Sequence, residues 1–257
     1  MSVVAQSARA RPCSSAIRSS VLVAFLVLSL GGPPAVLAQH DPHENHGPGG
    51  HADHAGPAHD DHDATARHRF DDVERWVERF DDPERDGWQK PESVIAFLAP
   101  PENAVVADIG AGTGYFTVRL ARALGGGGRV LAVDVEQALV EHIRARAERD
   151  GLSGVETILG EFDDPGLPEA GVDRILIVDT WHHIDDRLSY LDRLERALRP
   201  GGTVVVVDFR EGDLPVGPPP GHKLSERHVR GEFDKAGWTL VETSDTLAYQ
   251  YMLKFRP

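Results

Sequence analysis

A glycine-rich turn follows a short apolar stretch near the middle of the chain. The segment AVVADIGAGTGYFTVRLARAL places an apolar strand, a turn and an amphipathic helix in immediate succession. Gly110, Gly112 and Gly114 let the backbone turn sharply, and the helix directs its free N–H groups at whatever binds there. Asp108 precedes the first glycine, and Tyr115 stands where a dinucleotide-binding turn has its third glycine. Because a carboxylate repels pyrophosphate and attracts ammonium, the turn predicts a ligand with an amino group.

A second acid ends the next apolar strand. The segment RVLAVDVE leads into Asp134, where a carboxylate can accept hydrogen bonds from both ribose hydroxyls. This role is common to NAD and S-adenosylmethionine (SAM), and a solvated loop acid or helix cap is the structural alternative. SAM joins an adenosine to an amino acid and has no phosphate, which agrees with Asp108. In the later segment LGEFDDPGLP, Asp163 is the first candidate and Glu161 the second for a hydrogen bond to the adenine amino group.

A pair of histidines follows the fourth strand, in DRILIVDTWHHIDDR. Asp179 ends that strand at the edge where open α/β sheets bind ligands. A histidine there can remove a proton from a methyl acceptor, because its ordinary pKa lies near working pH, and His182 is favoured over His183. The alternative is that one histidine packs against the cofactor and the other caps the helix that starts near Asp185. Trp181 is expected at the wall of the cofactor pocket.

The elements that position these residues alternate between apolar strands and amphipathic helices from Ala104 onward, which predicts parallel strands joined by right-handed crossovers. Strands are expected at 104–109, 129–134, 155–159, 173–179, 203–208, 238–243 and 247–255, and helices at 114–124, 136–149, 186–198 and 225–236. The last two strands have no helix between them, which predicts an antiparallel hairpin. Before the alternation, helical spacing predicts a leading helix, and a second helix is expected from Pro91 to Leu98. The leading helix has an apolar stripe of Phe70, Val73, Trp76, Val77 and Phe80.

Together, DIGAGTG, VDVE, DTWHHIDD and LRPGGTVVVVDF resemble the class I SAM-dependent methyltransferases, and among them the small-molecule group related to ubiquinone and menaquinone biosynthesis. The resemblance covers about residues 90–257. It implies an α/β fold with a Rossmann-like, doubly wound sheet of seven strands, mostly parallel with an antiparallel last strand. It also implies SAM as cofactor, with Asp108 and the turn including Ala111 at the methionine part, Asp134 at the ribose, and Asp163 or a nearby acid at the adenine. The position of Asp179 at the end of its strand makes it a further cofactor-binding candidate.

Missing motifs narrow the chemistry. DTWHH stands where amide and adenine N-methylating relatives have Asn/Asp-Pro-Pro-Tyr. The cysteines that pyrimidine C5-methylating and arsenic-methylating relatives need are also missing, because Cys13, the only cysteine, lies in the predicted signal peptide. O-, N- or C-methylation of a small molecule remains. Acceptor contacts are expected from two segments near the end of the chain, GHKLSERHVR and AYQYMLKF, although a structural role is an equal alternative for each residue. The candidates are His222, Tyr249, Gln250 and Tyr251.

The amino-terminal part has a different composition. Residues 1–38 resemble a signal peptide, with basic residues up to Arg18, the apolar run VLVAFLVLSL and a small-residue cleavage site ending at Ala38. The chain is then exported, to the periplasm or outside the cell, and an uncleaved membrane anchor is the alternative. Residues 39–68 form a histidine-rich linker, expected to be disordered, that could bind divalent metal loosely. Its candidate ligands are His40, His43, His46, His51, His54, His59 and His62. Residues 69–103 form a helical lead-in, and residues 104–257 the SAM-binding domain.

The charge of the chain bears on its partners. The formal net charge is -14, and residues 1–38 contain arginines but no acid, so the remainder is more negative still. Such a surface disfavours nucleic acid and anionic membranes, and favours a small-molecule substrate. Two alternatives to a methyltransferase stay open. One is an exported non-catalytic protein that keeps the fold and sequesters metal, favoured because SAM is not made outside the cytosol, and the other is an NAD-dependent oxidoreductase.

Overall fold

The computed structural model describes residues 73–257. The predicted signal peptide, the predicted histidine-rich linker and Phe70 lie outside the described residues. The helices are α1 (Val73–Phe80), α2 (Arg85–Gln89), α3 (Pro91–Leu98), α4 (Tyr115–Leu124), α5 (Gln137–Arg149), α6 (Arg187–Ala197) and α7 (Glu226–Lys235). The strands are β1 (Val105–Ile109), β2 (Arg129–Asp134), β3 (Val155–Leu159), β4 (Val172–Val178), β5 (Leu198–Phe209), β6 (Thr239–Ser244) and β7 (Gln250–Arg256).

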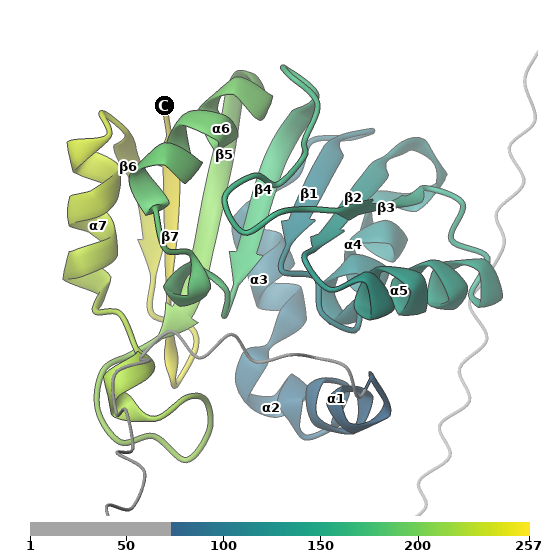
Figure 1. Ribbon diagram of the computed structural model, residues 1–257, viewed down its shortest axis with the longest axis horizontal. Coiled ribbons are helices and arrows are strands. Elements are labelled where there is room, and N and C mark those ends of the chain that lie inside the picture. Colours follow the sequence, from purple (N-terminus) through teal and green to yellow (C-terminus); the bar gives the residue numbers. More distant parts are fainter. Residues whose placement is uncertain (1–72) are drawn as a thin grey trace, which may run out of the picture. The chain divides into compact units, whose positions relative to one another are not determined.

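The strands form one sheet of seven in the order β3-β2-β1-β4-β5-β7-β6 (Figure 1). The first five strands pair in parallel, and β7 runs antiparallel to both β5 and β6. This confirms the predicted seven-stranded sheet with a reversed last strand. In the register of the sheet, Ile109 stands beside Val133 of β2 and Ile177 of β4. The segments that follow these three strands therefore start level with one another, at one edge of the sheet.

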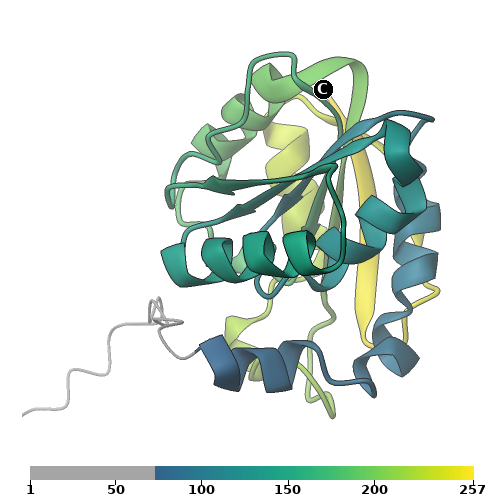
Figure 2. The same cartoon turned by 90° about the vertical axis from the view of Figure 1, so that its right-hand side faces the viewer.

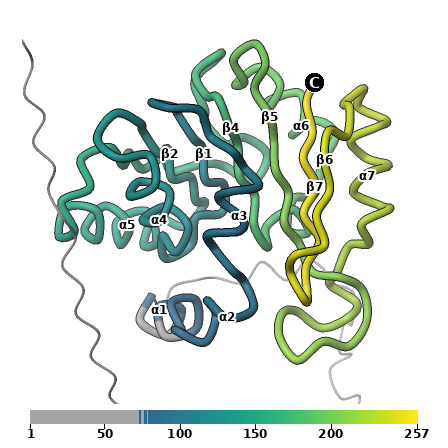
Figure 3. The backbone as a smooth tube through the Cα atoms, turned by 180° about the vertical axis from the view of Figure 1, so that it is seen from behind, coloured from purple at the N-terminus to yellow at the C-terminus, as the bar shows by residue number. Residues whose placement is uncertain are grey.

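Helices cover both faces of the sheet because its strands are apolar on both sides. One face packs against α6 and α7, where Leu191 and Phe233 are fully buried. The other packs against α3 and α4 through residues such as Leu98 and Leu120, and α5 adds Ile143 against Ala132 of β2. Figure 3, seen from behind, shows α3 crossing that second face. This two-sided arrangement is the doubly wound architecture that the sequence predicts.

Most predicted boundaries lie within a residue or two of the observed ones, with three larger differences. Strand β7 begins at Gln250 instead of 247. Strand β5 begins at Leu198 instead of 203, because Leu198 already pairs with Val172 before an irregularity in the β4–β5 ladder. Helix α2 was not predicted. It spans only five residues, includes Gly87, and is followed by Lys90, whose left-handed backbone (φ 45°) turns the chain into α3.

The lead-in helices α1 and α2 lie at the end of the sheet where the parallel strands finish (Figures 1 and 2). This is the edge at which open α/β sheets bind ligands. None of the helices described between residues 73 and 257 has the length and apolar character needed to cross a membrane. In the same part of the chain, no three acidic, histidine or cysteine side chains are grouped as metal ligands would be.

Candidate active site

Four aspartates mark the carboxyl edge of the sheet. Asp108 lies in β1, Asp134 ends β2, Asp179 follows β4, and Asp208 lies near the end of β5. Three of them are buried, and the side chain of Asp179 is 22% exposed. The structure thus brings together three of the five acids that the sequence singled out, Asp108, Asp134 and Asp179, and adds Asp208. The sequence contains a signal for Asp208, because this acid follows the apolar run VVVV just as the other acids follow apolar runs.

The glycine turn is bonded to its neighbours on both sides. The amides of Gly110 and Ala111 both donate to the carbonyl of Val133, at 2.9 and 3.0 Å, which joins the turn to the end of β2. Gly110 has a φ of 71°, and a Cβ there would overlap the side chain of Thr180, just after β4. The Gly112 amide donates to Asp134 Oδ2 at 2.8 Å. The turn and the ends of β2 and β4 therefore form one closely packed unit.

Asp108 and Asp134 are acids kept out of water. Burial raises the pKa of Asp108 to about 6, although the Thr117 hydroxyl donates to its Oδ2 at 2.6 Å and the charge of Arg85 acts in the opposite direction. Burial likewise raises the pKa of Asp134 to about 6, against hydrogen bonds from the amides of Glu136 and Gly112. A cation placed beside Asp108 would stabilise its ionised form. An ammonium group fits this position, and hydroxyl donors fit Asp134.

His182 and Asp208 form a buried hydrogen-bonded pair. His182 belongs to a 3-10 helix, Trp181–His183, and its Nδ1 lies 3.0 and 2.9 Å from the two carboxylate oxygens of Asp208. Because an ionised carboxylate only accepts, Nδ1 carries a proton and Nε2 is left as an acceptor in the neutral ring. Burial lowers the pKa of His182, but the bond to Asp208 and the charges of Asp208 and Asp179 outweigh it, and the pKa is raised. This arrangement suits a general base.

The other residues of the DTWHHIDD segment do not share the buried position of His182 beside Asp208. The ring of His183 is exposed, with its centroid 4.1 Å from that of His182. The cap of α6 is Asp186, which accepts from the Ser189 amide, so neither histidine has that role. The prediction that Trp181 lines the cofactor pocket is wrong. Trp181 is fully buried in the core, with its ring 5.1 Å from that of Phe233 and its Nε1 donating to Glu232.

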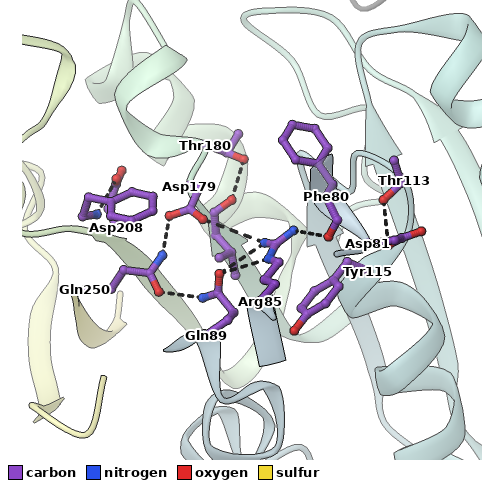
Figure 4. Close-up of polar contacts among 12 residues, drawn as sticks. Phe80, Asp81, Arg85, Gln89, Thr113, Tyr115, Asp179, Thr180, Asp208 and Gln250 are labelled. Atoms are coloured by element: carbon purple, nitrogen blue, oxygen red, sulfur yellow. Dashed lines mark hydrogen bonds and ion pairs between the residues drawn. The ribbon is translucent and has the colours of Figure 1, made fainter. Parts of the chain in front are cut away.

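A ring of four polar side chains joins α2 to the carboxyl edge (Figure 4). Arg85 donates from Nε and Nη2 to Gln89 Oε1, at 3.3 and 3.2 Å. Gln89 Nε2 donates to Gln250 Oε1 at 2.6 Å, and Gln250 Nε2 donates to Asp179 Oδ1 at 2.5 Å. An ion pair of 3.9 Å between Arg85 and Asp179 closes the ring. Asp179 has a left-handed backbone with a φ of 52°, a strained conformation of the kind found at functional sites.

The remaining candidates are scattered. Glu161 and Asp163 are exposed in the loop after β3, where Asp163 lies 3.4 Å from Arg193, and their role at the adenine stays a prediction. Tyr251 is buried in the core, and its hydroxyl donates to the carbonyl of Leu224. His222 is exposed, in a short 3-10 helix. Among the four expected acceptor contacts, Gln250 bonds directly to Asp179, Tyr251 stands beside Asp208 in the sheet, and Tyr249 is in ring contact with Trp88 of α2.

Comparison with known proteins agrees with this geometry. Residues 106–202 match a family model described as a methyltransferase domain. The chain is 32% identical over 117 residues to an uncharacterized methyltransferase of Mycobacterium tuberculosis, which is 46% of this chain and 44% of the relative. It is 30% identical over 144 residues to a probable S-adenosylmethionine-dependent methyltransferase of Mycolicibacterium smegmatis, covering 54% and 53% of the two chains. The chain therefore spans about half the length of these curated relatives.

A solved structure extends the similarity to most of the described chain. The crystal structure of a SAM dependent methyltransferase from Aquifex aeolicus superposes with a TM-score of 0.68 at 27% identity. The match covers 72% of this chain and 97% of the Aquifex chain. The similarity in fold thus goes well beyond residues 106–202.

Replacing Gly110 by alanine should lower the free energy of unfolding more than replacing Gly151. Both glycines have positive φ, 71° and 67°, so alanine at either position costs about 1–2 kcal/mol. Only at Gly110 would the new Cβ also overlap another side chain, that of Thr180, since nothing lies within 4 Å of a Cβ at Gly151. We expect an additional loss of about 1–3 kcal/mol in urea denaturation of the full chain. Equal losses in the two variants would show that the turn is not packed against β4.

Proposed function

The chain belongs to the class I SAM-dependent methyltransferases, and on that premise we propose that it transfers the methyl group of SAM to a small molecule, with His182 as general base. SAM is the cofactor of this family and supplies a methyl group already activated by its sulfonium. The observation that supports the proposal most strongly is the glycine turn bonded to Asp134 with the buried Asp108 beneath it. These residues offer a carboxylate to an ammonium group and another to a ribose, and the backbone at Gly110 has no room for a side chain.

The roles of the site residues follow from their positions. Asp108 would pair with the ammonium group and Asp134 would accept from the ribose hydroxyls. Methyl transfer is a displacement in line with the bond that breaks, so holding the acceptor in place and excluding water supply much of the rate. His182 would take the proton from an acceptor O–H or N–H at Nε2. Asp208 holds the ring in the tautomer that leaves Nε2 free of a proton and stabilises the imidazolium that forms.

Calorimetric titration of the full chain with SAM, with S-adenosylhomocysteine and with NADH tests the proposed function. We expect heat of binding with the first two ligands and none with NADH. Release of S-adenosylhomocysteine in the presence of candidate small molecules then identifies the acceptor. If neither sulfur ligand binds at high protein concentration, the chain is not a working methyltransferase, and binding of NADH alone would favour an oxidoreductase.

The affinity for SAM should fall as the pH drops below about 6. The pKa of Asp108 is raised to about 6, so the carboxylate that would pair with the ammonium group becomes protonated there and the attraction is lost. Titrations from pH 5 to 8 measure the effect. An Asp108→Asn variant should bind more weakly at pH 8 and depend less on pH, with the remaining slope due to Asp134, whose pKa is about 6, and Asp179, whose pKa is about 7. An unchanged pH profile in this variant would exclude Asp108 from the binding site.

The rate of methyl transfer should rise with pH through a value above the ordinary imidazole pKa of about 6.5. His182 has a raised pKa, and it accepts a proton only in its neutral form, which accumulates above that pKa. His182→Gln should lower kcat by about 100-fold, whereas His183→Gln, at the exposed neighbour, should change it little. In Asp208→Asn the charge is lost and burial dominates, so NMR titration should show a lower pKa for His182. An unchanged pKa in this variant would contradict the pairing.

A further inference from the structure

Arg85 is a largely buried cation that lies among the aspartates of the carboxyl edge. Its side chain is 13% exposed, and its guanidinium carbon lies 4.0 Å from the centroid of the Tyr115 ring, directly after the glycine turn. Its charge lowers the pKa values of Asp108 and Asp179 from what burial alone would give. Arg85 therefore lies at the methionine end of the proposed SAM site.

The hydrogen bonds of Arg85 leave donors unused. A guanidinium has five N–H groups. Toward the described residues, Arg85 uses one on Nε and one on Nη2, both to Gln89, and one on Nη1, to the carbonyl of Phe80 at 2.9 Å. One N–H on each terminal nitrogen remains, and two such donors match the two oxygens of a carboxylate.

The neighbouring arginines are already engaged. Arg119 also contacts the Tyr115 ring, at 3.9 Å, but pairs with Asp86 at 2.7 Å. Arg146 lies near the turn and pairs with Asp81 at 2.7 Å. Arg85 differs from both, because its acidic partner, Asp179, is 3.9 Å away and beyond hydrogen-bond distance. It is thus the cation in this group that can take a further carboxylate without giving up a close ion pair.

The ligand carries charges that need separate partners. The methionine part of SAM has an ammonium group, which Asp108 would take, and a carboxylate, which the buried acids of the site would repel. We infer that Arg85 binds this carboxylate through its two unused N–H groups, with Gln89 and the carbonyl of Phe80 fixing the orientation of the guanidinium. This inference rests on the proposed function. It makes α2 part of the cofactor site, although α2 precedes the glycine turn in the sequence and lies outside residues 106–202.

Two ligands that differ in one group test the inference. SAM and decarboxylated SAM share the adenosine, the sulfonium and the amino group, and only SAM has the carboxylate. In calorimetric titrations of the full chain, Arg85→Met should weaken binding of SAM by about 10- to 100-fold and leave decarboxylated SAM nearly unchanged. Arg85→Lys should fall between, since it keeps the charge and loses the pair of donors.

Arg119→Met is the matched control, because it removes a cation from the same aromatic ring at a more exposed position, and should leave the ratio of the two affinities unchanged. A loss of folding in Arg85→Met would lower both affinities together, so the ratio separates recognition from stability, and circular dichroism of Arg85→Lys checks the fold. Equal weakening of both ligands in a folded Arg85 variant, or an unchanged affinity for SAM, would overturn the inference. If the unmodified chain binds neither SAM nor S-adenosylhomocysteine, the proposed function itself fails.

Discussion

The burial of carboxylates at one edge of the sheet is the constraint on which the site depends. Asp108, Asp134 and Asp208 are each less than a tenth exposed, and a buried charge is costly unless it is hydrogen-bonded or paired. Hydrogen bonds from the surrounding residues lower this cost for each acid. Thr117 donates to Asp108, backbone amides donate to Asp134, and His182 bonds to Asp208. Asp108 and Asp134 still have pKa values raised to about 6. These hydrogen bonds offset only part of the cost of burying the carboxylates, so the edge favours a ligand that brings positive charge to it.

Much of the fold could be predicted because it depends on local pattern. Two of its patterns lie in consecutive residues: apolar runs that end in an acid, and a glycine turn between a strand and a helix. The ends of β1, β2 and α4 could therefore be predicted to within a residue or two. The reversed last strand followed from the missing helix between two apolar runs. The three acids at the ends of β1, β2 and β4 could be found for the same reason. Parallel strands must finish at one edge, whatever the packing of the helices.

The rest of the site could not be predicted, because it is made by contacts distant in the sequence. Gln89 and Gln250 are 161 residues apart and bond only because β7 inserts beside β5. Arg85 lies in a five-residue helix without an apolar stripe, and nothing in its neighbourhood indicates an acid that follows β4. The prediction for Trp181 was wrong because it relied on neighbours in the sequence. Trp181 stands next to the candidate base His182, but the 3-10 helix turns its ring toward α7 and into the core.

The ring of Arg85, Gln89, Gln250 and Asp179 also bears on the acceptor. It connects a helix that precedes the glycine turn to the last strand, so the proposed cofactor site and the last strand are joined by the same hydrogen bonds. Burial raises the pKa of Asp179 to about 7, with the charge of Asp208 acting in the same direction. An anionic acceptor would have to enter beside these two acids, against the formal net charge of -14 that the whole chain carries. On the proposed function, we therefore expect a neutral acceptor that gives up its proton only at His182.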